Sequence, residues 1–213
     1  MGPADAAAQL AGPAPGAGDT RAPLATIDAA RWTARLVLRA YEPGDLAAFH
    51  DLFGREDVCR FIPFGPLDLE AARSKLDLRT RQTRIANDGD ALLFAVTESA
   101  SERMIGELML RVSSVANRQG EIGWAFHPEV HGRGYATEGA QELLRLGFEE
   151  LGLHRISASC DARHTASLRV MERLGMRREA ELRESELLRG EWTSEIVCAI
   201  LEPEWRRAAG RPG

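Results

Sequence analysis

The chain lacks several features that mark particular classes of protein. Its only cysteines are Cys59, Cys160 and Cys198, which are odd in number, far apart and outside any metal-ligand spacing. Such usage is typical of a reduced compartment, so we expect a cytoplasmic protein. No apolar run approaches the roughly 20 residues that a membrane-spanning helix needs. The sequence therefore predicts neither a disulfide framework nor a membrane protein.

The chain also carries no excess of positive charge. The net charge is -5, the pI is near 5.6, and Lys75 is the only lysine among 27 lysine and arginine residues. Without an overall basic field, nucleic acid is not expected as a principal ligand. A metal site is not expected either, because Pro128 denies His127 and His131 a shared helix face.

Large apolar side chains are scarce in the first thirty or so residues, which are rich in alanine, proline and glycine. Such a segment cannot bury enough surface to offset its ordering entropy, and it lacks the basic start and apolar core of a targeting peptide. We expect a disordered tail at 1–31, one folded domain at 32–207 and a short tail at 208–213. The 213 residues suffice for one domain with a sizeable core.

From residue 35 onward, apolar periodicity predicts a regular series of elements. Strands are expected at 35–41, 91–98, 104–112, 120–128, 154–160, 179–188 and 191–201. Helices are expected at 45–53, from Asp68 to about Ile85, at 135–151 and at 164–175. Gly152 can end the third helix, and Arg189 with Gly190 should turn the final hairpin.

This order predicts an α+β fold built on a mixed β-sheet. About six or seven strands should form the sheet, and about four helices should flank it. Strands joined by short turns should pair antiparallel, whereas the strands before and after the 135–151 helix should pair parallel.

The stretch "HGRGYA", His131 to Ala136, places two glycines directly ahead of a strongly amphipathic helix. Glycines let the main chain approach a ligand closely, and the free N–H groups of a helix N-terminus attract anions. The pattern is that of a phosphate site, with a simple tight turn as the alternative.

The same stretch resembles the acyl-coenzyme A signature of the GNAT acetyltransferases, Gln/Arg-x-x-Gly-x-Gly/Ala. "RHTASLRVMERLGM" resembles a second segment of that family, and "RLVLRAY" and "RESELLRGEW" extend the resemblance over about residues 33–205. The ribosomal-protein N-terminal acetyltransferases look like the closest branch.

The resemblance implies acetyl-CoA as co-substrate, with its pyrophosphate on the loop and its pantetheine arm along the preceding strand. The residues it assigns to the coenzyme are Phe126, His131, Gly132, Arg133, Gly134, Tyr135, Ala136, His164 and Ser167. His131 stands where glutamine or arginine is usual, and His164 where asparagine is usual. A neutral imidazole at residue 131 is a poorer phosphate partner, so we expect weaker or more pH-dependent binding there, whereas at residue 164 it can still donate a hydrogen bond. A structural or solvated role is the alternative for each histidine.

For catalysis, the resemblance assigns Ser167 to the departing thiolate, with helix capping as its alternative. Glu186 matches the base proposed for the ribosomal-protein branch. It also lies with Glu184 among the even positions of 180–188, otherwise apolar, where burial would raise its pKa. Glu121 is a third candidate for the base. Ion pairing or solvation is the alternative for each glutamate.

The sequence shows no arrangement for covalent catalysis, so we expect direct acetyl transfer in a ternary complex. The expected acceptor is a primary amine, most simply a peptide or protein α-amino group. Alternatives are a small-molecule amine, such as an aminoglycoside, polyamine or amino-acid derivative, and a non-catalytic acyl-CoA-binding protein. A homodimer is left open.

Overall fold

A computed structural model of the chain describes residues 24–101, 103–208 and 210. Within these residues the strands are β1 (Ala25–Thr26), β2 (Arg31–Trp32), β3 (Leu36–Arg39), β4 (Arg84–Ile85), β5 (Ala91–Glu98), β6 (Met104–Ser114), β7 (Gln119–Phe126), β8 (Arg155–Asp161), β9 (Arg177–Leu188) and β10 (Glu191–Leu201). The helices are α2 (Leu46–Phe53), α3 (Glu56–Cys59), α4 (Leu69–Arg79), α5 (Tyr135–Arg145), α6 (Thr165–Arg173) and α7 (Glu202–Ala208). Two short 3-10 helices are η1 (Pro43–Asp45) and η2 (Pro128–Val130), and a π-helical segment, η3 (Leu146–Glu150), continues α5. None of these helices is long and apolar enough to cross a bilayer.

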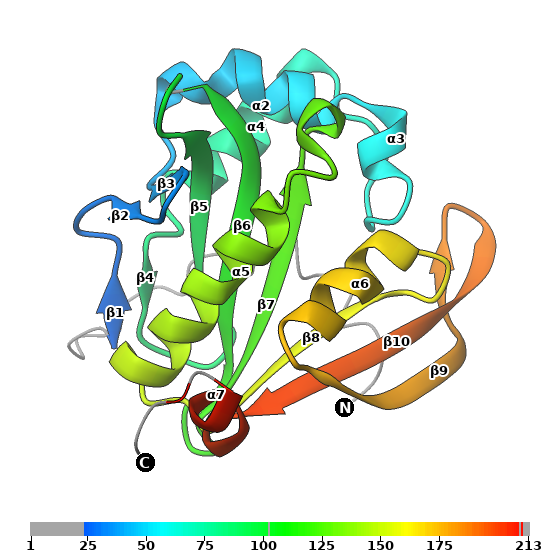
Figure 1. Ribbon diagram of the computed structural model, residues 1–213. Helices are drawn as coiled ribbons and strands as arrows, with labels where there is room; N and C mark the ends of the chain where they lie inside the picture. Colours follow the sequence, from blue (N-terminus) through cyan, green and yellow to red (C-terminus); the bar gives the residue numbers. More distant parts are fainter. Residues whose placement is uncertain (1–23, 102, 209, 211–213) are drawn as a thin grey trace.

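The described strands form one large mixed sheet in the order β2-β3-β5-β6-β7-β8-β10-β9, and β1 pairs with β4 beside it (Figure 1). Neighbours in the large sheet are antiparallel except β7 and β8, which are parallel and connected through α5. The mixed α+β fold predicted from the sequence is therefore confirmed, including its single parallel pair in this sheet.

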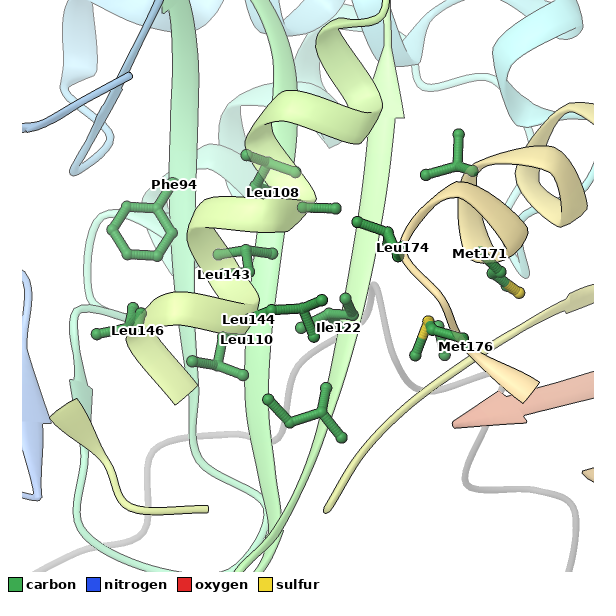
Figure 2. Packing of buried hydrophobic residues seen from close by; sticks show 14 of the residues in the cluster. Phe94, Leu108, Leu110, Ile122, Leu143, Leu144, Leu146, Met171, Leu174 and Met176 are labelled. Carbon is green, nitrogen blue, oxygen red and sulfur yellow. The ribbon is translucent and has the colours of Figure 1, made fainter. Parts of the chain in front are cut away.

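Helices cover both faces of the sheet because its central strands are apolar on both sides. In β5, Leu92, Phe94 and Val96 belong to the core that includes buried residues of α5 and α6. Leu93 and its neighbours of the same parity face a second core with α2 and α4. Figure 1 shows α5 crossing β5, β6 and β7, and Figure 2 shows the leucines of α5 against Leu108 and Leu110 of β6.

Helix α4 is shorter than predicted. Its N-terminus is capped as expected, since Asp68 accepts a hydrogen bond of 2.8 Å from the amide of Ala71. The helix ends at Arg79 rather than near Ile85. Ile85 is fully buried in the core on the α5 face, whereas α4 packs on the opposite face. The chain has to leave helical geometry to pass from one face of the sheet to the other.

The folded part of the chain begins before the expected boundary at residue 32. Leu24 and Ile27 donate main-chain hydrogen bonds of 2.7 and 2.8 Å to Ile85 and Thr83. Arg31 pairs with Glu150, with 2.6 Å between Nη2 and Oε2. Residues 24–31 thus contact the domain, and the rest of the expected tail, 1–23, lies outside the described residues.

Candidate active site

The site lies where β7 and β8 separate. The two strands pair only at Gln119 with Arg155, Gly120 with Ile156, and Glu121 with Ser157. Beyond these pairs they diverge (Figure 1), and a cavity of about 390 Å³ lies among residues 122–126 of β7, residues 159–161 of β8 and the starts of α5 and α6. Hairpin β9–β10 and the loop that contains α3 complete its wall.

The glycine loop opens onto this cavity. Gly132 and Gly134 have φ values of +78° and +81°, a left-handed conformation that side-chain-bearing residues rarely adopt. A Cβ at Gly132 would meet nothing within 4 Å, so the loop leaves free space ahead of the first turn of α5. Gly132, Gly134, Tyr135 and Ala136 line the cavity, and the geometry fits an anionic group held by helix N–H donors.

Arg133 is the one residue of this loop stretch that is not part of the cavity wall. Its side chain is exposed and lies 3.5 Å from Glu98. Its carbonyl instead accepts a hydrogen bond of 2.9 Å from Arg35, which also pairs with Glu138 in the first turn of α5. Arg35, the residue directly before β3, therefore holds the loop in place, a role that the sequence did not reveal.

Both histidines line the cavity. His131 Nε2 lies 2.9 Å from the carbonyl oxygen of Phe126, which can only accept, so Nε2 carries a proton. The ring of His164 packs against that of Phe61, with centroids 4.6 Å apart and planes tilted by 39°. Burial lowers the pKa of His164, and nearby Asp161 only partly offsets this. The His164 ring is therefore neutral at neutral pH.

Ser167 is buried in the first turn of α6 and lines the cavity. Its Oγ accepts a hydrogen bond of 3.3 Å from Trp124 Nε1, which reaches across from β7. The N-cap position of α6 belongs to His164 rather than to Ser167. The serine hydroxyl therefore faces the cavity with its own hydrogen available for a further acceptor.

Glu186 lines the same cavity from β9. Its Oε1 is enclosed and has no hydrogen-bond partner within the residues that the structure describes. Burial raises the pKa of Glu186, and the negative charges of Glu195 and Asp161 raise it further. A carboxyl group of this kind can exchange a proton closer to neutral pH than an exposed glutamate can.

The predicted alternation along β9 is wrong, because the strand contains a bulge. Leu182 pairs with Glu195 and Glu186 pairs with Thr193, so residues 183–185 stand opposite a single residue of β10. Glu184 lies in this bulge with φ +46° and is exposed. Leu182 is also exposed, and of the two expected glutamates only Glu186 lines the cavity.

Glu121 lies apart from these groups. It is buried on β7, but it does not line the cavity and its Oε2 is 2.7 Å from Arg111 Nη2. The structure thus brings Ser167 and Glu186 to one cavity and places Glu121 in an ion pair within the sheet.

Several cavity residues were missed by reasoning from the sequence. Trp124 and Asp161 lie at the ends of β7 and β8, and Phe61 lies in the α3 loop, defined here as residues 56–63. Glu195 had a weak signal, since it is an acid at the head of the apolar run "IVCAIL". Phe61 had none, because only the tertiary fold brings its loop to α6.

Arg189 connects the α3 loop to the hairpin. It occupies the turn between β9 and β10 with φ +49°. Its guanidinium lies 3.0 Å from Glu56 and donates to the carbonyls of Cys59 and Arg60 at 3.1 and 2.9 Å. The loop that carries Phe61 is therefore held against the wall that carries Glu186.

The fold and the site together indicate the class of protein to which the chain belongs. The family model described as "Acetyltransferase (GNAT) domain" matches residues 35–177, and the chain belongs to that family. The protein is an N-acetyltransferase that uses acetyl-CoA as its acetyl donor and an amine as its acceptor.

Among its relatives is an uncharacterised N-acetyltransferase, YnaD, of Bacillus subtilis, 35% identical over 81% of this chain and 97% of that protein. A GNAT-family acetyltransferase structure from Bacillus anthracis is similar with a TM-score of 0.74 and 34% identity, over 83% of this chain and 100% of that one. Spermidine N-acetyltransferase from Vibrio cholerae, solved with CoA and spermine, shares the fold with a TM-score of 0.69 and 21% identity, over 81% of this chain and 99% of that one.

Proposed function

We propose that the protein acetylates the N-terminal α-amino group of a peptide or protein, with Glu186 as the base and Ser167 as the proton donor to the leaving sulfur. One observation carries the proposal. An enclosed carboxylate with a raised pKa and a serine hydroxyl that Trp124 orients line one cavity beside the glycine loop. The ribosomal-protein resemblance of residues 183–192 supports a peptide acceptor.

Residues of two elements would hold the coenzyme. The N–H groups at residues 132–136 would bind its phosphates, and main-chain groups of β7 near Phe126, which have no strand partner on the β8 side, would lie along its pantetheine arm. When bound, acetyl-CoA supplies an activated acetyl carbon that accepts the amine nitrogen as the C–S bond breaks.

The side chains of Glu186 and Ser167 transfer the protons. Glu186 takes one proton from the acceptor ammonium and leaves a nucleophilic nitrogen. Ser167 passes its hydroxyl proton to the sulfur and regains one from the new amide nitrogen. The balance is an ammonium and a thioester converted to an amide, a thiol and one released proton. The neutral His164 adds no positive charge beside the incoming ammonium.

A small-molecule amine is the second candidate acceptor. The carboxylates in the cavity would attract any ammonium, and the Vibrio cholerae structure with the same fold is named for spermidine. The two candidates share the chemistry at nitrogen and differ in what surrounds it.

The test is release of free CoA thiol with a panel of N-terminal peptides and small amines, with mass spectrometry of each product. Peptides acetylated at the α-amino group with kcat/KM well above that of the small amines would support the proposal. Acetylation of small amines alone would overturn the peptide assignment, and binding of acetyl-CoA without transfer to any amine would overturn the catalytic roles.

A further inference from the structure

Three carboxylates converge on the cavity from three neighbouring strands. Glu195 of β10 is directly opposite Asp161 of β8, and Thr193, two residues earlier on β10, is directly opposite Glu186 of β9. Residues that pair directly in an antiparallel sheet share a face, as do residues two apart on one strand. All four side chains line the cavity, so the acids lie on one wall.

Only one of the three acids has its charge balanced. Asp161 accepts from the backbone and guanidinium of Arg163, with 2.7 Å between Oδ2 and Nη2. Glu186 and Glu195 have no side-chain hydrogen bond or ion pair to a cation in the described residues, although Glu195 is only 7% exposed. The charges that act on Glu186 are the negative ones of Glu195 and Asp161.

Two unbalanced carboxylates inside a cavity are costly to the folded protein. Burial disfavours the charge of Glu186, and the negative charge of Glu195 beside it adds to that penalty. A ligand that brings positive charge relieves both penalties, and one that brings two charges relieves them most. The separation suits such a ligand, because Glu186 lies opposite Thr193 and Glu195 is therefore its diagonal neighbour, about 7–8 Å away.

We propose that Glu186 and Glu195 together select an acceptor with two positive charges, in which the reacting ammonium meets Glu186 and a second cationic group meets Glu195. This inference rests on the proposed function, since it takes Glu186 as the base for the reacting amine. The shared chemistry is a second cation a short chain away from the reacting nitrogen. A polyamine provides it, and so does a peptide whose first residues are basic.

The test compares acceptors that differ only in the second charge. One pair is 1,4-diaminobutane and 1-aminobutane, and the other is a tetrapeptide Ser-Lys-Gly-Ala and its Ser-Gln-Gly-Ala counterpart. In the wild-type protein, kcat/KM for the dicationic member should be higher by about tenfold or more, as expected for a charge-assisted contact to a buried carboxylate. If the preference appears in just one of the two pairs, that pair shows whether the second cation comes from a polyamine or from a peptide.

Glu195→Gln keeps the shape and removes the charge. It should reduce the preference to less than about threefold, and do so mainly through loss of rate with the dication. Glu184→Gln removes an exposed charge from the neighbouring strand β9, outside the cavity, and should retain the wild-type preference. The dissociation constant of acetyl-CoA, measured for each variant, controls for folding.

The outcomes separate this inference from the proposed function. If the wild-type protein acetylates amines but prefers neither member of either pair, the two-charge site is overturned while the N-acetyltransferase roles stand. A preference that survives Glu195→Gln also overturns it. If acetyl-CoA binds and no amine is acetylated, it is the proposed roles of Glu186 and Ser167 that fail.

Discussion

Trp124 donates its indole N–H to Ser167 Oγ at 3.3 Å, across the space between β7 and α6. This bond joins the strand that leads into the glycine loop to the helix that follows β8. Because the serine oxygen accepts here, the direction of its O–H hydrogen is restricted to the remaining positions around Oγ. The pair therefore fixes where the serine can deliver a proton.

Ser167→Ala should lower kcat by about 10²-fold, the usual size of a general-acid contribution, and change the dissociation constant of acetyl-CoA little. Trp124→Phe keeps an aromatic ring and removes only the N–H, so its loss in kcat should be smaller. Saturation kinetics and calorimetry measure the two quantities. An unchanged kcat in Ser167→Ala would remove the serine from the proton path.

Glu186→Gln should lower kcat by about 10²-fold at neutral pH, with partial recovery at high pH where more of the amine is already deprotonated. In the wild-type protein, burial with Glu195 and Asp161 raises the pKa of Glu186. The rate should fall as the pH drops through this raised pKa, because a protonated carboxyl cannot accept the proton. Glu195→Gln should shift this fall in rate to lower pH, because it removes one of the negative charges that raise the pKa of Glu186.

Stability should show the opposite dependence. Since the pKa of Glu186 is higher in the folded protein than in the unfolded chain, its contribution to stability is largest at acid pH and is lost as pH rises through the folded value. Glu186→Gln lacks this loss. Its Tm relative to wild type should therefore rise from pH 4 to pH 8, and a constant difference would show that the carboxyl is not perturbed.

Gly134→Val should weaken acetyl-CoA binding by about tenfold or more. Valine opposes the left-handed backbone at φ +81°, and its Cβ would lie 3.5 Å from Arg35 Nη2. Gly152→Val is the matched control, since Gly152 has φ +62°, open space around it and a place outside the cavity. Each substitution should cost about 1–2 kcal/mol of stability. Equal binding losses in the two variants would mean that strain alone accounts for the effect.

Arg189→Asn should raise KM for the amine by about threefold to tenfold and leave acetyl-CoA binding unchanged, because Arg189 holds the α3 loop and not the glycine loop. Asparagine tolerates the left-handed turn, so the substitution removes the guanidinium with little backbone cost. Arg118→Asn offers the same comparison at φ +51° in a turn outside the cavity. A larger effect on acetyl-CoA than on the amine would contradict the assignment.

Cys160 lines the cavity, yet it should not react. Burial raises the pKa of its thiol to about 12, so almost none is thiolate at neutral pH. Cys160→Ala should retain kcat within about twofold. Iodoacetamide at pH 7.5 should modify the folded protein far more slowly than the unfolded chain. Trapping of acetyl on Cys160 would replace direct transfer with a covalent route.

Local pattern was enough to predict the fold class, the parallel pair and the glycine loop. The loop could be predicted because two glycines directly ahead of an amphipathic helix indicate a backbone conformation that is set locally. Ser167 was assigned differently, by the resemblance of its segment to the GNAT family, and the structure places it on the cavity wall.

Long-range contacts set the limits of that prediction. The alternation along β9 failed at Glu184, because a bulge depends on how β9 registers against β10 and not on β9 alone. Helix α4 ended early because Ile85 belongs to the core on the other face. Phe61 and Glu195 join the site only through tertiary packing. The ion pair of Glu121 with Arg111 depends on the neighbouring strand, which the sequence of β7 alone does not reveal.

The short pairing of β7 with β8 has a mechanical consequence. In the part of the chain that the structure describes, only residues 119–121 and 155–157 join the β2–β7 part of the sheet to the β8–β10 part by a strand ladder. A ligand that lies in the opening and bonds to both strands acts as a cross-link between two lobes, and its binding free energy adds to the folded state alone. The protein should accordingly melt as a stiffer, more cooperative unit when acetyl-CoA is bound, and the opening between the strands is where that rigidity is gained.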